Sequence, residues 1–201
     1  MPRFRKRIGS RECGFSLLEV LIALVILSIG LLGIAGLQLT SKRTNFEAVQ
    51  RTTATMLARD MIERMRANPG QFAAYTNNGA GFEFTPESGY TSAATDCNAA
   101  ACVPATLATY DLYEWERAIL GTAEVSSGGA NTGGLVSPTG CITVPAGSPA
   151  GTVNIAIAWR GLTDLGNPGI DPCGEGTGLY DDTGGDNVFR RVIVVNTFIG
   201  S

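Results

Sequence analysis

The longest apolar stretch of the 201-residue chain lies near its N-terminus. Residues 15–39 (FSLLEVLIALVILSIGLLGIAGLQL) are apolar apart from Glu19 and a few small or amide side chains, and residues 20–37 carry no charge. As a helix, these roughly 25 residues would extend about 37 Å, enough to cross a hydrocarbon core of about 30 Å. The pattern therefore predicts a transmembrane helix.

Helical signals continue beyond this stretch, because residues 41–67 contain neither Gly nor Pro and a stop follows at Asn68-Pro69-Gly70. Apolar side chains recur there at helical spacing: Ala54, Leu57 or Ala58, Met61 and Met65. We therefore expect one helix over residues 15–67. Residues 15–40 would form the half that lies in the membrane and serves in assembly. Residues 41–68 would form an amphipathic half that includes the C-terminal end of the helix.

The remainder, residues 69–201, is rich in Gly, Asn, Thr and Ser, which predicts short strands joined by long turns. Residues 153–160 alternate as a strand with one buried face, and residues 141–144 form a shorter candidate. The run 188–199 is apolar on both faces near its centre, so we expect it in the interior of a sheet. A second helix is predicted over residues 104–120, with a face made of Ala108, Leu112, Trp115 and Ile119. That face is expected to pack on the sheet.

Charge is distributed unevenly along the chain. The first 14 residues hold five basic residues and one acidic residue, a net charge of +4. The other 187 residues hold ten basic and seventeen acidic residues, a net charge of −7. A basic segment before a membrane helix predicts a cytoplasmic N-terminus and an external remainder. The overall charge of −3 gives no case for nucleic-acid binding. The absence of His excludes catalysis by an imidazole and metal ligation by an imidazole.

Two simpler interpretations of the apolar run are open. A secretory signal peptide could be cleaved near Gly33-Ile34-Ala35, although the run is longer than the usual apolar core of about 7 to 15 residues. A plain membrane anchor would leave Glu19 unexplained, since a carboxylate at the centre of a membrane helix costs about 2.5–3.5 kcal/mol.

The segment Cys13-Gly14-Phe15-Ser16-Leu17-Leu18-Glu19-Val20-Leu21 resembles the class III signal of type IV pilins and pseudopilins. The resemblance implies that residues 1–14 are a leader, cut between Gly14 and Phe15 by a prepilin peptidase that also methylates Phe15. The uncut helix would serve as anchor and assembly spine. In the family, the carboxylate at the position of Glu19 is thought to meet the N-terminal amine of a neighbouring subunit, and an amine in this apolar layer does require an opposite charge.

A second stretch, residues 102–115 (CVPATLATYDLYEW), is similar to one found in PilV-type minor pilins. Together the two resemblances imply an α+β, type IV pilin-like fold: a long N-terminal helix packed on a C-terminal antiparallel β-sheet head. They imply a minor pilin that helps to prime or cap a type IV pilus, and a part in twitching motility. Its partners would be the prepilin peptidase, other minor pilins, the major pilin, the inner-membrane assembly platform and the lipid bilayer. The head would be periplasmic, and the protein would then reach the pilus at the cell surface.

Cys13 would be removed with the leader, which leaves an even number of cysteines outside the cytoplasm and favours disulfides. These four cysteines, Cys97, Cys102, Cys141 and Cys173, allow three connectivities. We favour Cys97–Cys102 and Cys141–Cys173, since the second pair would tie two strand ends across a Gly-rich loop. A zinc site is less favoured, because no CxxC spacing occurs.

The acidic turn with Asp181, Asp182 and Asp186 could hold calcium, although the same residue types suit an ordinary turn. No cofactor is expected.

Two other functions stay open. An I-type minor pseudopilin of a type II secretion system would share the leader and helix. A membrane-anchored enzyme has little support, because no nucleophile–base pair, phosphate loop or metal spacing appears.

Overall fold

The computed structural model describes residue 14 and residues 16–87, 93, 95–122, 126–129, 131, 133–182 and 184–200. Most of the predicted leader, residues 1–13, and the predicted methylation site Phe15 therefore lie outside the described residues. Internal contacts divide the chain into two compact units, residues 1–44 and 45–201.

Helix α1, Leu17–Ala67, runs through both units. In the second unit it is amphipathic, and Ala54, Ala58, Met61 and Met65 on its inner face are fully buried. The predicted apolar stripe is thus confirmed. The helix ends before Asn68, because Pro69 has no N–H to donate and disfavours a helical conformation at the residue that precedes it; Asn68 has φ −134°.

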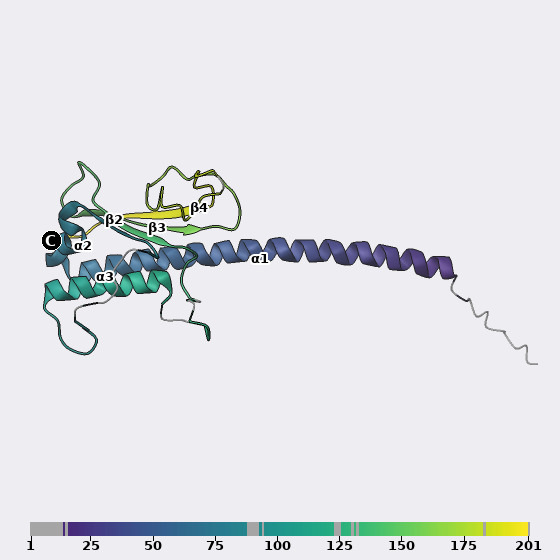
Figure 1. The fold of residues 1–201 in the computed structure, drawn as a ribbon, viewed down its shortest axis with the longest axis horizontal. Coiled ribbons are helices and arrows are strands. Elements are labelled where there is room, and N and C mark those ends of the chain that lie inside the picture. The colour runs from purple at the N-terminus through teal and green to yellow at the C-terminus, as the bar shows by residue number, and fades with distance from the viewer. Residues whose placement is uncertain are drawn as a thin grey trace, which may run out of the picture. The chain divides into compact units, whose positions relative to one another are not determined.

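Four strands form one antiparallel sheet in the order β1-β2-β3-β4 (Figure 1). They are β1 (Phe82–Phe84), β2 (Thr139–Thr143), β3 (Thr152–Arg160) and β4 (Arg190–Phe198). The α+β, type IV pilin-like fold is confirmed, with the second part of α1 packed against this sheet. Strand β1 has no counterpart among the expected elements.

The expectation for the C-terminal strand is wrong in one respect. Its bounds contract from 188–199 to Arg190–Phe198, and among the described residues β4 lies at an edge of the sheet, with β3 as its one neighbouring strand. Strand β3 is the buried one, whereas most residues of β4 are only half-buried. The two-faced apolar pattern arises because both faces of β4 are covered, not because strands flank it on both sides.

The two faces of the sheet are covered by different elements of the chain. On one face, α1 and α3 (Pro104–Leu120) pack on Ile142, Ile155 and Ile157 to form the main core. On the other, Cys141, Ala156 and Ala158 contact Cys173 and Tyr180 of the long segment between β3 and β4. Figure 1 shows this arrangement, with α1 and α3 on one side of the strands and the loops on the other.

The second helix has the bounds predicted from the sequence, and its predicted face is buried. Gly121 ends α3 in the left-handed conformation, with φ 65°. A Cβ atom there would lie 1.9 Å from the carbonyl oxygen of Gly133, so only glycine fits. Between α1 and β1 the chain forms short helical turns: Pro69–Gln71, α2 (Phe72–Tyr75) and Asn77–Gly79.

Candidate functional site

The N-terminal end of α1 carries one acidic residue in its first turn, Glu19. The Ser16 carbonyl accepts the N–H groups of Glu19 (3.0 Å) and Val20 (3.2 Å), which starts the helix directly after the predicted cleavage point. The partial positive charge of a helix N-terminus favours a carboxylate there. Within the described part of the chain, Glu19 has no ion-pair partner. Its charge is therefore available to a cation from outside.

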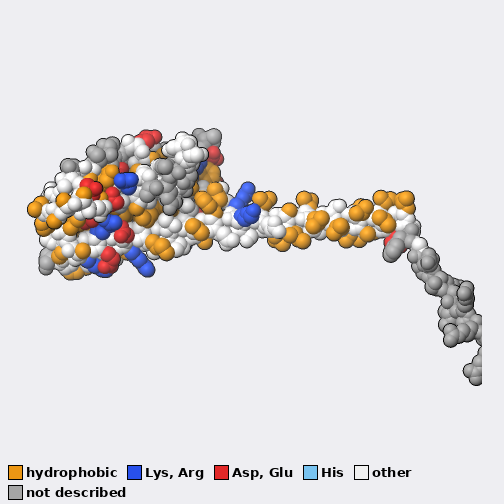
Figure 2. Space-filling model, turned by 90° about the horizontal axis from the view of Figure 1, so that it is seen from below, with side chains coloured by type: hydrophobic (Ala, Val, Ile, Leu, Met, Phe, Trp, Pro, Cys, Tyr) orange, Lys and Arg blue, Asp and Glu red, His pale blue; other side chains and the backbone are white. Residues whose placement is uncertain are grey.

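Large apolar side chains surround this carboxylate and continue along the helix. Leu17 is 78% exposed, Leu18 65% and Leu21 52%, and exposed Leu, Ile and Val side chains extend to Leu39. Hydrophobic side chains cover this part of α1 in Figure 2. Among the described helices, α1 alone is long and apolar enough to cross a membrane, by length and composition. This surface needs lipid or other apolar helices around it.

In the second unit, α3 is held against α1 by a buried polar cluster that the sequence did not reveal. Asp111 accepts a hydrogen bond from Arg64 of α1 (Nη1 to Oδ1, 3.0 Å) and another from Tyr75 of α2 (Oη to Oδ2, 2.5 Å). The Nδ2 of Asn68 donates to the Pro104 carbonyl at 2.8 Å. Burial and the bond to Asp111 raise the pKa of Tyr75. The aspartate of the 102–115 stretch thus joins three helices.

The indole of Trp115 provides a second link. It is fully buried, and its Nε1 donates to the Leu57 carbonyl of α1 at 2.8 Å. The ring packs edge-on against Phe84, with centroids 5.9 Å apart. This confirms the packing role expected for the second helix.

Among the described residues, disulfides join Cys97 to Cys102 and Cys141 to Cys173, which are the pairs favoured from the sequence. The first closes a small loop just before α3. The second joins β2 to the segment between β3 and β4, across the face of the sheet that α1 and α3 leave open.

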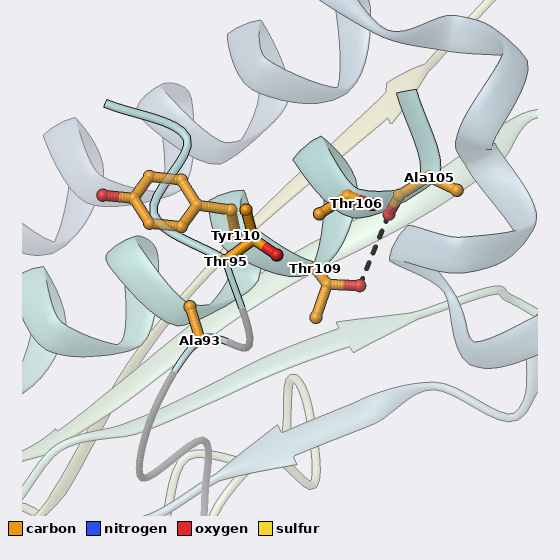
Figure 3. A pocket seen from close by; sticks show the side chains of 6 residues that line it. All are labelled: Ala93, Thr95, Ala105, Thr106, Thr109 and Tyr110. Atoms are coloured by element: carbon orange, nitrogen blue, oxygen red, sulfur yellow. Dashed lines mark hydrogen bonds between the residues drawn. The ribbon is translucent and has the colours of Figure 1, made fainter. Parts of the chain in front are cut away.

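A pocket of about 340 Å³ lies at the N-terminal half of α3. Its lining side chains are Ala93, Thr95, Ala105, Thr106, Thr109 and Tyr110 (Figure 3). The Thr109 hydroxyl donates to the Ala105 carbonyl, and the Tyr110 hydroxyl bonds Asn98 and Asp96. The lining offers hydroxyls and methyls but no nucleophile paired with a base.

Arg190 organises the long segment between β3 and β4. This side chain is 1% exposed, and it donates to four oxygen atoms without any carboxylate among them. The acceptors are Asn167 Oδ1 and the carbonyls of Pro168, Asp171 and Cys173. Nearby, the Tyr180 hydroxyl bonds Thr139 at 2.8 Å, and burial raises the pKa of Tyr180 to about 12.

The described residues of the acidic turn form no metal site. Asp181 Oδ1 accepts the Asn187 N–H at 2.9 Å, so this carboxylate oxygen already has a partner within the chain. No group of three or more His, Cys, Asp or Glu side chains that could hold a metal ion occurs among the described residues. Neither Asp182 nor Asp186 joins Asp181 in such a group.

Two family models match the chain. The prokaryotic N-terminal methylation motif matches residues 9–35, and the Tt1218-like model, described as type IV pilin Tt1218, matches residues 36–113. The matches adjoin and together cover just over half of the chain. Searches of curated proteins and of solved structures gave no significant match.

Proposed function

Since the chain is a type IV pilin by its family matches and its fold, we propose that it acts as a minor pilin of the PilV type. In this role it joins other minor pilins in a complex that primes or caps the pilus, and that complex meets the major pilin and the inner-membrane assembly platform. The role is structural, and chemistry is performed on the protein rather than by it.

The observation that carries the proposal is the methylation motif placed at the start of an apolar helix that holds one unpaired carboxylate. Prepilin peptidase would hydrolyse the peptide bond between Gly14 and Phe15, which releases residues 1–14. It would then methylate the new amino group of Phe15. The first turn of α1 begins beyond this bond, with the Ser16 carbonyl as its first acceptor, so cleavage leaves the helix intact.

Cleavage also creates a positive charge beside an apolar surface. Glu19 lies in the first turn of α1, and an opposite charge in this layer is worth more than it would be in water. We infer that Glu19 receives the methylated amine of a neighbouring pilin as the subunit enters the filament. The basic leader supports an orientation with the N-terminus in the cytoplasm and the head in the periplasm.

An I-type minor pseudopilin is the alternative, because it would use the same leader and the same kind of helix. The resemblance of residues 102–115 to PilV-type minor pilins supports the pilus role, and the family model that matches through residue 113 is described as a type IV pilin. The two roles differ in where the mature chain is found.

The test is mass spectrometry of the mature protein recovered from sheared pili of the organism that produces it. The expected result is an N-terminal N-methylphenylalanine from Phe15. An N-terminus at Gly36 would mean a cleaved signal peptide and would refute the pilin role. A chain methylated at Phe15 that is absent from pili, but needed for protein secretion, would favour the pseudopilin.

A further inference from the structure

We propose that the outer edge of β4 binds an extended strand of a different pilin subunit, so that the sheet continues from one head into the next. The inference deepens the function proposed above and rests on it. The outer edge means the backbone N–H and C=O groups of Val192, Val194, Asn196 and Phe198 that face away from β3.

The pairing of β3 with β4 determines which groups face outward. The ladder is flanked by two bonds of 2.8 Å, from Gly161 N to the Phe189 carbonyl and from Ile199 N to the Gly151 carbonyl. Bonded and non-bonded pairs alternate in an antiparallel ladder, so the odd-numbered residues of β4 bond β3 and the even-numbered ones point outward.

The side chains of one pair agree with this assignment. Asn196 lies opposite Asn154, and its Nδ2 donates to Asn154 Oδ1 at 2.6 Å. Side chains approach most closely in non-bonded pairs. The backbone N–H and C=O of Asn196 therefore point away from β3.

No other part of the described chain covers this edge. Outside the β3–β4 ladder, the described residues make no hydrogen bond to the backbone of residues 191–198. Asn196 is exposed, and Phe198 is 59% exposed. Among the described residues, the outward N–H and C=O groups therefore have no hydrogen-bond partner.

The side chains of β4 are those of an interior strand. Val192 and Val194 pack toward the Cys141–Cys173 disulfide, while Ile193 and Val195 pack toward the helices. Soluble proteins usually protect long edge strands with Lys, Pro or a bulge. Residues 192–198 contain no Lys or Pro, and the register is regular through all nine residues of β4. An added strand would give β4 the two neighbours that its sequence suits.

The length of the edge counts against a second copy that adds through its own β1. The opposite edge strand of this chain, β1, has three residues against nine in β4, so a second copy adding through β1 would cover only part of the edge. Main-chain hydrogen bonding selects an extended segment rather than a helix or a small molecule. Because a minor pilin assembles with other pilins, we assign the occupant as a longer edge strand of a sister pilin head.

The test compares Asn196→Pro with Asn196→Ala in the full-length chain, expressed in piliated cells. Both variants lose the side-chain bond to Asn154, but only proline removes the outward N–H, and neither removes a backbone hydrogen bond to β3. After detergent extraction, the expected result is at least about a tenfold lower recovery of other pilins with the proline variant. Equal recovery with the two variants would overturn the proposal.

A second measurement does not depend on proline being tolerated. A photoreactive amino acid at position 196 of the otherwise unchanged protein should cross-link to another pilin. Cross-links only to a second copy of this chain, only to a non-pilin protein, or to no protein would each overturn the proposal. The proposed function is judged separately, by methylated Phe15 and by the presence of Asn196→Ala in sheared pili. The proposal that β4 binds another strand can therefore be refuted while the proposed minor pilin role is retained.

Discussion

Arg64 of α1 and Asp111 of α3 are 47 residues apart in sequence and form an ion pair with an Nη1–Oδ1 distance of 3.0 Å. The side chain of Asp111 is 10% exposed and that of Arg64 is 32% exposed. The second oxygen of Asp111 accepts a hydrogen bond from the Tyr75 hydroxyl, so this carboxylate links α1, α2 and α3.

Asp111→Ala should lower the free energy of unfolding by about 3 kcal/mol, because it leaves the Tyr75 hydroxyl and part of the Arg64 guanidinium without an acceptor. Asp111→Asn keeps an acceptor of the same shape and should cost about half as much. Urea unfolding of the detergent-solubilised protein would measure both. Equal stability of the alanine variant and the wild type would show that the pair contributes nothing.

Arg190 and Arg191 are adjacent in β4 and provide a matched comparison. Arg190→Ala should destabilise the head by about 3–4 kcal/mol, because four oxygen atoms lose the donor that this buried side chain supplies and a cavity remains. Arg191→Ala should cost about 1 kcal/mol, since its contact with Glu47 is long, at 3.8 Å, and its hydrogen bonds to Thr163 lie at the exposed surface. Thermal unfolding of the two variants would test this order, and a smaller loss for Arg190→Ala would contradict it.

Stability should fall in alkaline solution as tyrosines ionise. The pKa of Tyr180 is about 12 in the folded protein, above the ordinary value of about 10 for an exposed tyrosine. The unfolded chain therefore loses this proton first, and the free energy of unfolding decreases as pH rises from about 10 to 12.

Tyr180→Phe removes the ionising group and should make this decrease shallower. Unfolding measurements at a series of pH values would compare the two slopes. Tyr75, whose pKa is also raised, should maintain part of the decrease in the variant. Identical slopes would mean that Tyr180 ionises alike in the folded and unfolded chains.

Glu19→Ala should leave cleavage and methylation at Phe15 unchanged but reduce the amount of protein in sheared pili about tenfold or more, because the incoming amine loses its counter-charge. Glu19→Gln should behave similarly, since the charge rather than the shape is at issue. Glu63→Ala, at an exposed position of the same helix, is the control and should enter pili normally. Quantitative immunoblotting of pilus fractions would measure all three, and normal incorporation of Glu19→Ala would exclude the pairing.

Local patterns in the sequence predicted the helices well. The faces of α1 and α3 followed from apolar residues at helical spacing, because one side of each helix must be buried. The four cysteines suggested disulfides, because an even number of cysteines in an oxidising compartment favours disulfide bonds over free thiols or metal ligation.

Contacts between residues far apart in the sequence were harder to predict from it. Asp111 looks like any solvent-facing aspartate until α1 is placed beside it, and Arg190 looks like one more surface charge at the start of a strand. The position of β4 was predicted incorrectly, because periodicity reports which faces of a strand are covered and not whether another strand lies beside it. For Arg190, the nearby Gly, Pro and Asn residues signalled a long loop, but not that the loop would fold around a cation.

The links between α1 and α3 also have a mechanical consequence. Trp115 holds the carbonyl of Leu57, Asp111 holds Arg64, and the carbonyl of Pro104 holds Asn68, so the attachments extend about 16 Å along α1. A pull along the axis of α1 would load these links in shear and together, rather than opening them one after another. Rupture would then require several bonds to fail at once, which is a favourable geometry for a subunit held by its helix in a fibre under tension.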